Sequence, residues 1–448
     1  MVEAIQKIRA AGLVGMGGAG FPTHVKLDAP IEHLIVNGLE CEPLLGTDRY
    51  VMRNLSDKLV EALSRLKSEC NVDKATFCLK KSYVKEIAAL KAAIDKAGAP
   101  IDIHTTESFY PAGDEQVVVY EVTGRTVPPM NIPLAVGCAV MNVGTLLAAY
   151  DGFCDKPLTH RYVTVTGAVN KPTVVYAPIG ASFAACIAAA GGVNRENCCI
   201  VSGGPMMGKR FPIEEMDNLF VSKTTSGILI LPLDKYRGAS VNMEQIRSRA
   251  KAACIQCNYC TQLCPRHLLG HPLEPHRIMR KLAYEKVENL MEDPVIQSAS
   301  LCSECGVCEV YACPMGLQPR SVNALLKQEL GKAGYRYPKG EASTTPHPMR
   351  SSRLAPTKRM AARAGVYAYY GAPLDVCVPV EPDCVTLSLR QGLGAPSQPQ
   401  VSVGQRVEQG ERIACCQEGK LGADLHASIC GVVEEISDGI RIRREESK

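Results

Sequence analysis

Two cysteine motifs of nearly the same spacing constrain this sequence more than any other feature. They are Cys254-x2-Cys257-x2-Cys260-x3-Cys264-Pro265 and Cys302-x2-Cys305-x2-Cys308-x4-Cys313-Pro314. Two-residue gaps let three thiolates of one tight loop reach three corners of a cubane cluster, and thiolates are the soft ligands that such clusters use. The motifs therefore predict two [4Fe–4S] clusters.

The fourth cysteine of each motif is expected to ligate the cluster of the other motif, as in two-cluster ferredoxins. The predicted ligand sets are Cys254, Cys257, Cys260 with Cys313, and Cys302, Cys305, Cys308 with Cys264. The second motif has four residues, Glu309 to Ala312, where the first has three, and a one-residue bulge in a helix would absorb the difference. A pair of zinc sites is the alternative, although a triple motif that ends in Cys-Pro is not typical of zinc.

The composition agrees with metal or redox chemistry. The chain has 21 cysteines, and its opening residues carry charges at Glu3, Lys7 and Arg9, unlike a signal peptide. Without export, the cysteines point to metal or redox work in a reducing cytosol rather than to disulfides. The near balance of 50 basic and 46 acidic residues gives no case for nucleic acid. No apolar run is long enough to predict a membrane span.

A chain of 448 residues is expected to form several domains. Residues 1–158 alternate predicted strands (Ile31–Val36, Thr76–Leu79) with amphipathic helices (Leu55–Cys70, Tyr83–Ala97), which predicts an α/β domain. Residues 159–240 are β-rich with one helix near Ser182–Ala190 and predict a small α+β module. Residues 241–334 hold the cysteine motifs, 335–372 are predicted to be a linker, and 373–448 predict a small β-sandwich or barrel.

A glycine-rich segment near the N-terminus predicts a phosphate or ring site. It reads Gly15-Met16-Gly17-Gly18-Ala19-Gly20-Phe21-Pro22-Thr23-His24-Val25-Lys26. Glycines let backbone N–H groups approach a phosphate or flat ring closely, and Lys26 could neutralise a phosphate. No strand of adequate length precedes the loop, so it does not match a Rossmann fingerprint. The polar run Asn37 to Pro43 follows a predicted strand, where open α/β sheets bind ligands.

Four segments in the same order carry a family resemblance: the glycine loop, Asn37-Gly38-Leu39-Glu40-Cys41-Glu42-Pro43, Tyr110-Pro111-Ala112-Gly113-Asp114-Glu115, and Asn142-Val143-Gly144-Thr145. Together they resemble the flavin- and NADH-binding subunit of respiratory complex I and, more closely, the C subunit of the Rnf complex. The resemblance implies an FMN site at Gly15, Gly17, Gly18, Lys26, Asn37, Glu40, Asn142 and Thr145. It implies an NADH side at Phe21, Glu42, Asp114 and Glu115, with Glu40 and Glu42 as the catalytic candidates. Met16 stands where complex I proteins usually carry Arg.

The resemblance extends over the remaining chain. Thr164–Val169 and the Thr224–Gly227 turn resemble a β-grasp ligand-binding module, and Gly394–Gly431 resembles the barrel-sandwich (lipoyl-like) module that Rnf C subunits carry at their N-terminus. With that module at the C-terminus, the chain resembles the cobalamin reductases of propanediol-utilisation microcompartments. The implied fold class is multidomain α/β and α+β, with a ferredoxin-like two-cluster helical domain between the β-grasp and barrel-sandwich modules.

That resemblance implies an NADH-dependent reductase that passes electrons through FMN and two clusters to cobalamin, from cob(III)alamin to cob(I)alamin. It also implies a cytoplasmic place in a bacterial microcompartment, beside shell or lumen proteins and a cobalamin adenosyltransferase. Two alternatives stay open: an Rnf-like enzyme with ferredoxin or quinone as acceptor, and an electron-conducting scaffold without its own substrate site. Lys420 lies where lipoyl domains carry a modified lysine, but its neighbours match no modification motif, so a solvated turn lysine is the expectation.

Overall fold

The computed structural model describes residues 2–234, 243–286 and 290–445. Its N-terminal part contains a four-stranded parallel sheet in the order β3-β2-β1-β5. The strands are β1 (His33–Asn37), β2 (Lys74–Lys80), β3 (Asp102–Thr106) and β5 (Cys138–Asn142). Parallel strands buried on both faces need nearly continuous apolar runs, and His-Leu-Ile-Val and Phe-Cys-Leu supply them.

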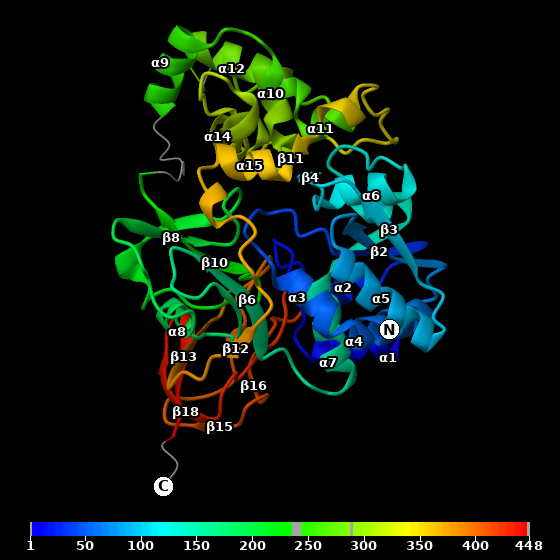
Figure 1. The fold of residues 1–448 in the computed structure, drawn as a ribbon, viewed down its shortest axis with the longest axis vertical. Helices are drawn as coiled ribbons and strands as arrows, with labels where there is room; N and C mark the ends of the chain where they lie inside the picture. The colour runs from blue at the N-terminus through cyan, green and yellow to red at the C-terminus, as the bar shows by residue number, and fades with distance from the viewer. Residues whose placement is uncertain (1, 235–242, 287–289, 446–448) are drawn as a thin grey trace.

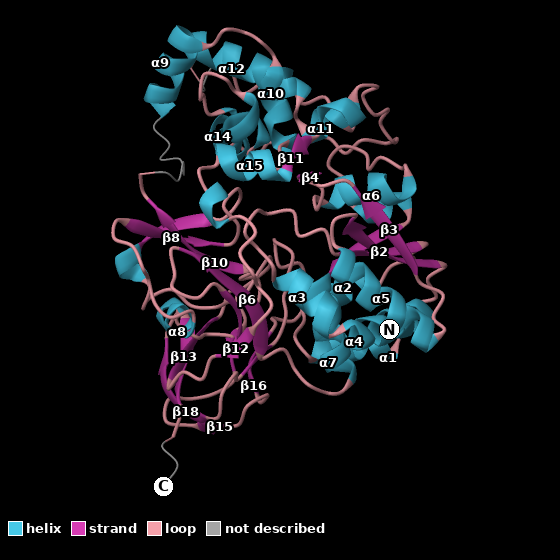
Figure 2. Cartoon of the chain, viewed as in Figure 1, coloured by secondary structure: helices cyan, strands magenta, loops and turns pink. Residues whose placement is uncertain are grey.

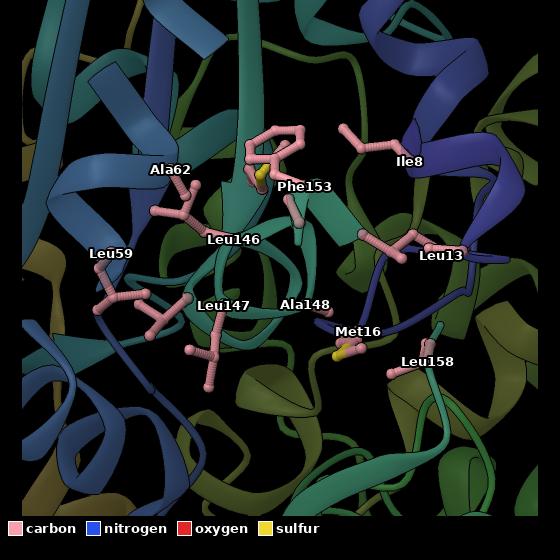
Figure 3. Close-up of a cluster of buried hydrophobic side chains, with 14 of the residues drawn as sticks. Ile8, Leu13, Met16, Leu59, Ala62, Leu146, Leu147, Ala148, Phe153 and Leu158 are labelled. Atoms are coloured by element: carbon pink, nitrogen blue, oxygen red, sulfur yellow. The ribbon is translucent and has the colours of Figure 1, made fainter. Parts of the chain in front are cut away.

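Helices cover this sheet and build the main core (Figure 3). The helices of the main core are α1 (Glu3–Ala10), α2 (Thr23–Leu27), α3 (Thr47–Asn54), α4 (Ser56–Glu69), α5 (Val84–Ala97) and α7 (Val143–Phe153), whereas α6 (Glu115–Thr123) packs in a second cluster. In α4, Leu59, Leu63 and Leu66 recur at helical spacing and are fully buried. The predicted strands and helices of this part, including Leu55–Cys70 and Tyr83–Ala97, are confirmed to within about two residues at most ends.

The second module is a six-stranded sheet in the order β12-β7-β6-β10-β8-β9. Its strands are β6 (His160–Gly167), β7 (Thr173–Pro178), β8 (Cys198–Ser202), β9 (Lys209–Pro212) and β10 (Gly227–Pro232), with α8 (Phe183–Ala189) packed against them. The sixth strand, β12 (Cys377–Pro379), comes from the C-terminal part and pairs in parallel with β7. The C-terminal part is therefore joined to this module by backbone hydrogen bonds.

Short helices hold the two cysteine motifs (Figure 2). They are α9 (Met243–Ala253), α10 (Tyr259–Gln262), α11 (Pro265–Leu268), α12 (Pro275–Tyr284), α13 (Pro294–Gln297) and α14 (Pro319–Lys332). Between Cys305 and Cys313 the chain forms a π-helix, η5 (Val307–Ala312). A π-turn inserts one residue into a helix. The bulge expected from the four-residue spacing is thus confirmed.

The stretch predicted to be a linker contains ordered elements. Within it, β11 (Ala355–Pro356) pairs with β4 (Phe109–Tyr110) of the α/β part. It is followed by α15 (Thr357–Arg363) and the 3-10 turn η7 (Tyr367–Tyr369). Met360, Ala361 and Val366 are buried in one cluster with Tyr110 and Val307. This segment therefore packs between the α/β part and the cysteine module, which its polar composition did not predict.

Two small antiparallel sheets close the chain, with the orders β13-β19-β18-β15 and β14-β16-β17. Their strands are β13 (Cys384–Ser388), β14 (Gln398–Pro399), β15 (Arg406–Val407), β16 (Arg412–Cys415), β17 (Leu425–His426), β18 (Gly431–Ile436) and β19 (Gly439–Arg443). Figure 1 shows the cysteine module and the C-terminal sheets at opposite ends of the molecule. The expected fold class, multidomain α/β and α+β, is confirmed. Among the described helices, none has the length and apolar character needed to cross a bilayer.

Candidate flavin and iron–sulfur sites

The glycine loop lies between α1 and α2, against the start of α7. The Gly15 amide donates to the Phe21 carbonyl at 2.8 Å, and the Met16 amide donates to Thr145 Oγ1 at 2.9 Å. Thr145 is buried, so its hydroxyl fixes the loop from inside. Two of the predicted flavin residues, Gly15 and Thr145, thus shape the loop's backbone in this structure.

The next part of the loop is open to a ligand. Gly17 and Gly18 are exposed, and a Cβ on Gly18 would meet no atom within 4 Å. A Cβ on Gly17 would lie 3.0 Å from the Cβ of Asn142, so the loop can approach the end of β5 this closely because it lacks side chains. Thr23 Oγ1, later in the same segment, is buried without a hydrogen-bond partner. The exposed backbone at Gly17 and Gly18 fits a group with phosphate and ring atoms, as FMN has.

Several predicted residues meet where the sheet ends. Lys26 Nζ lies 2.6 Å from the Glu115 carboxylate and 3.1 Å from the Val140 carbonyl. Asn37 Nδ2 donates to the Gly113 carbonyl at 2.9 Å. These contacts bring the first three motifs together, because β1, β4 and α6 all end or begin at this edge.

Asp48 joins two predicted residues and was missed by the sequence analysis. It accepts a hydrogen bond from Asn142 Nδ2 at 2.8 Å. The Glu40 carboxylate accepts from the backbone amides of Asp48 (3.2 Å) and Arg49 (3.4 Å), at the start of α3. Burial, and then repulsion from Asp48, raises the pKa of Glu40, and burial raises the pKa of Asp48. The two carboxyl groups therefore hold protons near neutral pH more readily than free carboxyls do.

Glu42 points away from Glu40, toward the other modules. Its carboxylate accepts from the Met206 amide at 2.9 Å, and its Oε1 lies 3.4 Å from the Tyr110 hydroxyl oxygen. Burial raises the pKa of Glu42 to about 7. A cavity of about 570 Å³ borders both Glu40 and Glu42 and is also lined by Arg49, Lys80 and Tyr83. The two glutamates thus share one cavity while they serve different neighbours.

The eight motif cysteines surround two separate cavities, four thiols in each. One cavity is bordered by Cys264, Cys302, Cys305 and Cys308, which we call the inner set. The other is bordered by Cys254, Cys257, Cys260 and Cys313, which we call the outer set. The structure therefore groups the thiols in the crossed arrangement expected from the ferredoxin pattern. Among the described residues, no three His, Cys, Asp or Glu side chains are placed to hold a single metal ion.

The chemistry around the thiols fits iron–sulfur clusters. The Glu304 amide donates to Cys302 Sγ and the Leu317 amide to Cys313 Sγ, both at 3.3 Å. In the inner cavity the buried side-chain amide of Asn323 lies beside Cys302. Burial raises the pKa of Cys260 and of Cys264 to about 12. Thiolates at these positions therefore need a cationic centre such as cluster iron.

Two direct contacts connect the inner set with the flavin-side motifs. The Tyr110 hydroxyl, which also contacts Glu42, donates to the Cys305 carbonyl at 2.7 Å. Asp114, the N-cap of α6, binds Arg266 through both carboxylate oxygens at 2.7 and 2.9 Å. Both side chains of this pair are about one-eighth exposed (12%). Both carboxylate oxygens of Asp114 are thus occupied by Arg266. The sequence analysis missed Arg266, and its position two residues after Cys264 is the sequence signal that could have identified it.

A buried arginine lies where the loop departs from the complex I pattern. Arg161, on β6, is 6% exposed, and its Nη2 lies 3.5 Å from the carbonyl of Met16. Its Nε has no hydrogen-bond partner. Arg161, Met16, Asp48 and Gly144 border a cavity of about 600 Å³ between the α/β part and the β-grasp sheet. A guanidinium therefore reaches this loop from another module.

Four family models match the chain in order. They are the Nuo51 FMN-binding domain (residues 8–151), the SLBB domain (162–209), the 4Fe-4S dicluster domain (253–318) and the RnfC barrel sandwich hybrid domain (375–447). The chain is thus an oxidoreductase with an FMN-binding domain and a dicluster domain.

Curated relatives extend the match over nearly the whole chain. Cobalamin reductase PduS of Salmonella typhimurium is 40% identical over 443 residues, which cover 97% of this chain and 95% of the relative. The protein of the same name from Citrobacter freundii is 39% identical over 439 residues, 97% of this chain and 94% of the relative. The C subunit of the proton-translocating ferredoxin:NAD(+) oxidoreductase complex of Clostridium ljungdahlii is 36% identical over 272 residues, 59% of this chain and 56% of that relative.

Proposed function

Since the chain belongs to the cobalamin reductase PduS family, we propose that it oxidises NADH and reduces cobalamin through a bound flavin and two [4Fe–4S] clusters. The reaction balances as NADH plus cob(III)alamin giving NAD⁺, a proton and cob(I)alamin, with two electrons moved. FMN supplies the conversion of a two-electron hydride donor into single electrons that clusters can carry. The chain contains both parts that this conversion needs, an FMN-binding domain and a dicluster domain.

The residues of the glycine loop would hold the flavin. Gly17 and Gly18 offer open backbone, and Lys26 offers a cation at the same edge of the sheet. Asn37 and Asn142 end the paired strands β1 and β5, and we expect them to line the same region together with Glu40, three residues after β1. Glu42, which borders the same cavity as Glu40, would contact the nicotinamide donor.

The direction of electron flow rests on one observation: the inner set touches the flavin side. Tyr110 donates a hydrogen bond to the Cys305 carbonyl, and Asp114 binds Arg266, two residues after Cys264. The cavity of the outer set is bordered instead by α12 and the residues around Pro314, all within the cysteine module. We therefore infer that electrons enter the cysteine module at the inner set and leave it at the outer set.

Cob(I)alamin is easily reoxidised, which favours direct delivery to an adenosyltransferase. A place in a propanediol-utilisation microcompartment follows from the same family relationship and belongs to this proposal. Encapsulation would keep the reduced product close to its consumer.

Anaerobic purification and an acceptor screen test the proposal. We expect about eight irons, about eight sulfides and about one FMN per chain, as two cubane clusters and one flavin require. NADH should then bleach the flavin and reduce cob(III)alamin to cob(I)alamin. Reduction of ferredoxin or quinone without reduction of cobalamin would reject the proposed substrate, and a flavin that NADH leaves oxidised would favour a scaffold role.

A further inference from the structure

The outer set lies closer to the surface than the inner set. All four outer cysteines are partly exposed, whereas Cys264, Cys305 and Cys308 of the inner set are buried. Figure 1 places α9, α10 and α12 at the end of the molecule away from the C-terminal sheets. Residues of α10 and α12 border the outer cavity, and α9 ends directly before Cys254. Because electron tunnelling weakens steeply with distance, a redox partner gains most by docking where a cluster is nearest to the surface.

Large apolar side chains surround this opening. Ile255, Tyr259 and Met315 are 61%, 50% and 41% exposed. Ile255 lies directly after Cys254, Met315 lies two residues after Cys313, and both border the outer cavity. Exposed apolar side chains scattered singly are common on protein surfaces, whereas a group of them at one place marks an interaction site.

Cationic side chains lie at or near the same opening, and Lys251 is three residues before Cys254. Arg249, Lys251 and Arg280 are exposed, and within the described part of the chain none of them forms an ion pair with a carboxylate. Arg280 borders the outer cavity, and Arg249 Nη2 donates to the Gly316 carbonyl at 3.1 Å, beside Met315. The acidic residues at the starts of α9 and α12, Glu244 and Glu274, already pair with Arg247 and Arg277. The opening is therefore apolar at its centre and positively charged at its rim.

We propose that this surface, made of Ile255, Tyr259, Met315, Arg249, Lys251 and Arg280, docks an electron-accepting protein with an acidic face around its redox centre. Positive charge around the exit steers such a partner and sets its orientation, while the apolar centre excludes water at the contact. In the transfer, the outer cluster is oxidised by one electron and the partner's centre is reduced by one, with no bond made or broken. The inference rests on the proposed function, because it takes the outer set as the exit.

The test compares charge-reversal variants of the rim with a matched pair elsewhere. Lys251→Glu combined with Arg280→Glu reverses the rim, and Lys91→Glu combined with Lys171→Glu makes the same change in charge at exposed positions of other modules. An acidic flavodoxin serves as the probe. Its binding to dithionite-reduced protein is measured by calorimetry, and its NADH-driven reduction by stopped flow, at low and high salt.

The rim variant should bind flavodoxin at least tenfold more weakly and lose most of the salt dependence, while the control pair binds like the unaltered protein. Cluster signals in electron paramagnetic resonance should be the same in all three proteins. Equal binding by the rim variant, or equal weakening in the control pair, would overturn the docking site. If NADH fails to reduce the clusters while binding still responds as expected, the proposed function fails and the docking site stands.

Discussion

Glu40 and Glu42, two residues apart in one motif, do different work in the folded chain. Glu40 accepts hydrogen bonds from the backbone amides of Asp48 and Arg49, so it fixes the start of α3 beside the proposed flavin site. Glu42 accepts a hydrogen bond from the Met206 amide and lies beside the Tyr110 hydroxyl. That hydroxyl donates to the carbonyl of Cys305, a cysteine of the inner set. A glutamate at the border of two modules is suited to sensing or positioning a donor that binds there.

Replacing Glu42 should slow NADH oxidation while both clusters stay in place. We expect Glu42→Ala to lower the rate of flavin reduction by NADH roughly tenfold or more, the scale of losing one positioned acid–base group. Because burial raises the pKa of Glu42 to about 7, the group ionises as the pH rises through neutrality, and Glu42→Gln should flatten that part of the pH profile. Stopped-flow flavin absorbance measures both effects.

Glu107→Ala provides the control for this variant, because Glu107 is exposed and pairs with Lys81 at the surface. Unchanged NADH kinetics in Glu42→Ala would remove Glu42 from the donor site. Loss of a cluster signal would instead show that Glu42 acts through Met206 and Tyr110 on the fold.

Residue types and spacing were enough to predict how the motif cysteines group, because each motif is local in sequence, whereas the flavin role expected of the glycine loop came from the family resemblance. The motif cysteines lie within a few residues of each other, and Gly15 to Lys26 is one continuous segment. Asp48 and Arg161 could not be found in this way. Their roles arise when α3 and β6 pack against β5 and the loop, and neither residue lies in a motif.

At the scale of elements, the turn before β10 fastens three parts of the chain together. Lys223 in this turn is fully buried, and its Nζ donates to the Gly12 carbonyl at 2.8 Å and to the Asp424 carbonyl at 2.6 Å. Gly12 follows α1, and Asp424 precedes β17. One side-chain amine therefore binds the β-grasp module to both the α/β part and the C-terminal sheets.

Lys223→Met should loosen this junction and change its pH dependence. Burial lowers the pKa of Lys223 from 10.5 to about 7. At pH values between these two pKa values, Lys223 binds more protons in the unfolded chain than in the folded chain. The contribution of Lys223 to the free energy of unfolding therefore falls as the pH drops from about 10.5 toward 7. The variant leaves the Gly12 and Asp424 carbonyls unpaired, which should lower the free energy of unfolding by about 1–3 kcal/mol. Because methionine does not titrate, the variant should also lack the pH dependence of stability that Lys223 contributes.

Hydrogen exchange at the amides around Asp424, compared at neutral and alkaline pH, measures the effect. Lys209→Met, which replaces an exposed lysine of the same module, is the matched control. Equal pH slopes in the unaltered protein and in Lys223→Met would contradict the assignment of the slope to Lys223.

At the scale of the whole molecule, the modules are predictable but their contacts are not. Strand periodicity predicted the C-terminal β domain, yet β12 leaves it to extend the β-grasp sheet through β7. The Leu393 amide donates to the Ala19 carbonyl at 3.0 Å, so the C-terminal part also contacts the glycine loop. Composition predicted a linker at residues 335–372, but the apolar residues of α15 pack with Tyr110 and Val307. Such long-range contacts depend on surfaces that one segment's pattern does not encode.

Contacts from three parts of the chain fix the position of the inner set. Tyr110 from the α/β part and Met206 from the β-grasp sheet share a buried cluster with Cys305. Arg320 Nη1, beside the inner cavity, donates to the Met206 carbonyl at 2.6 Å. The inner set is thus enclosed by all three parts, which suits it to receive electrons from the flavin side.

The order of the two sets is tested most directly by removing one ligand from each and following reduction by NADH with freeze-quench electron paramagnetic resonance. We predict that Cys305→Ala loses the inner signal and that NADH then fails to reduce the outer cluster at the native rate, although dithionite still reduces it. Cys257→Ala should lose the outer signal while NADH reduces the inner cluster normally. An outer cluster that NADH reduces at the native rate in Cys305→Ala would contradict the proposed path.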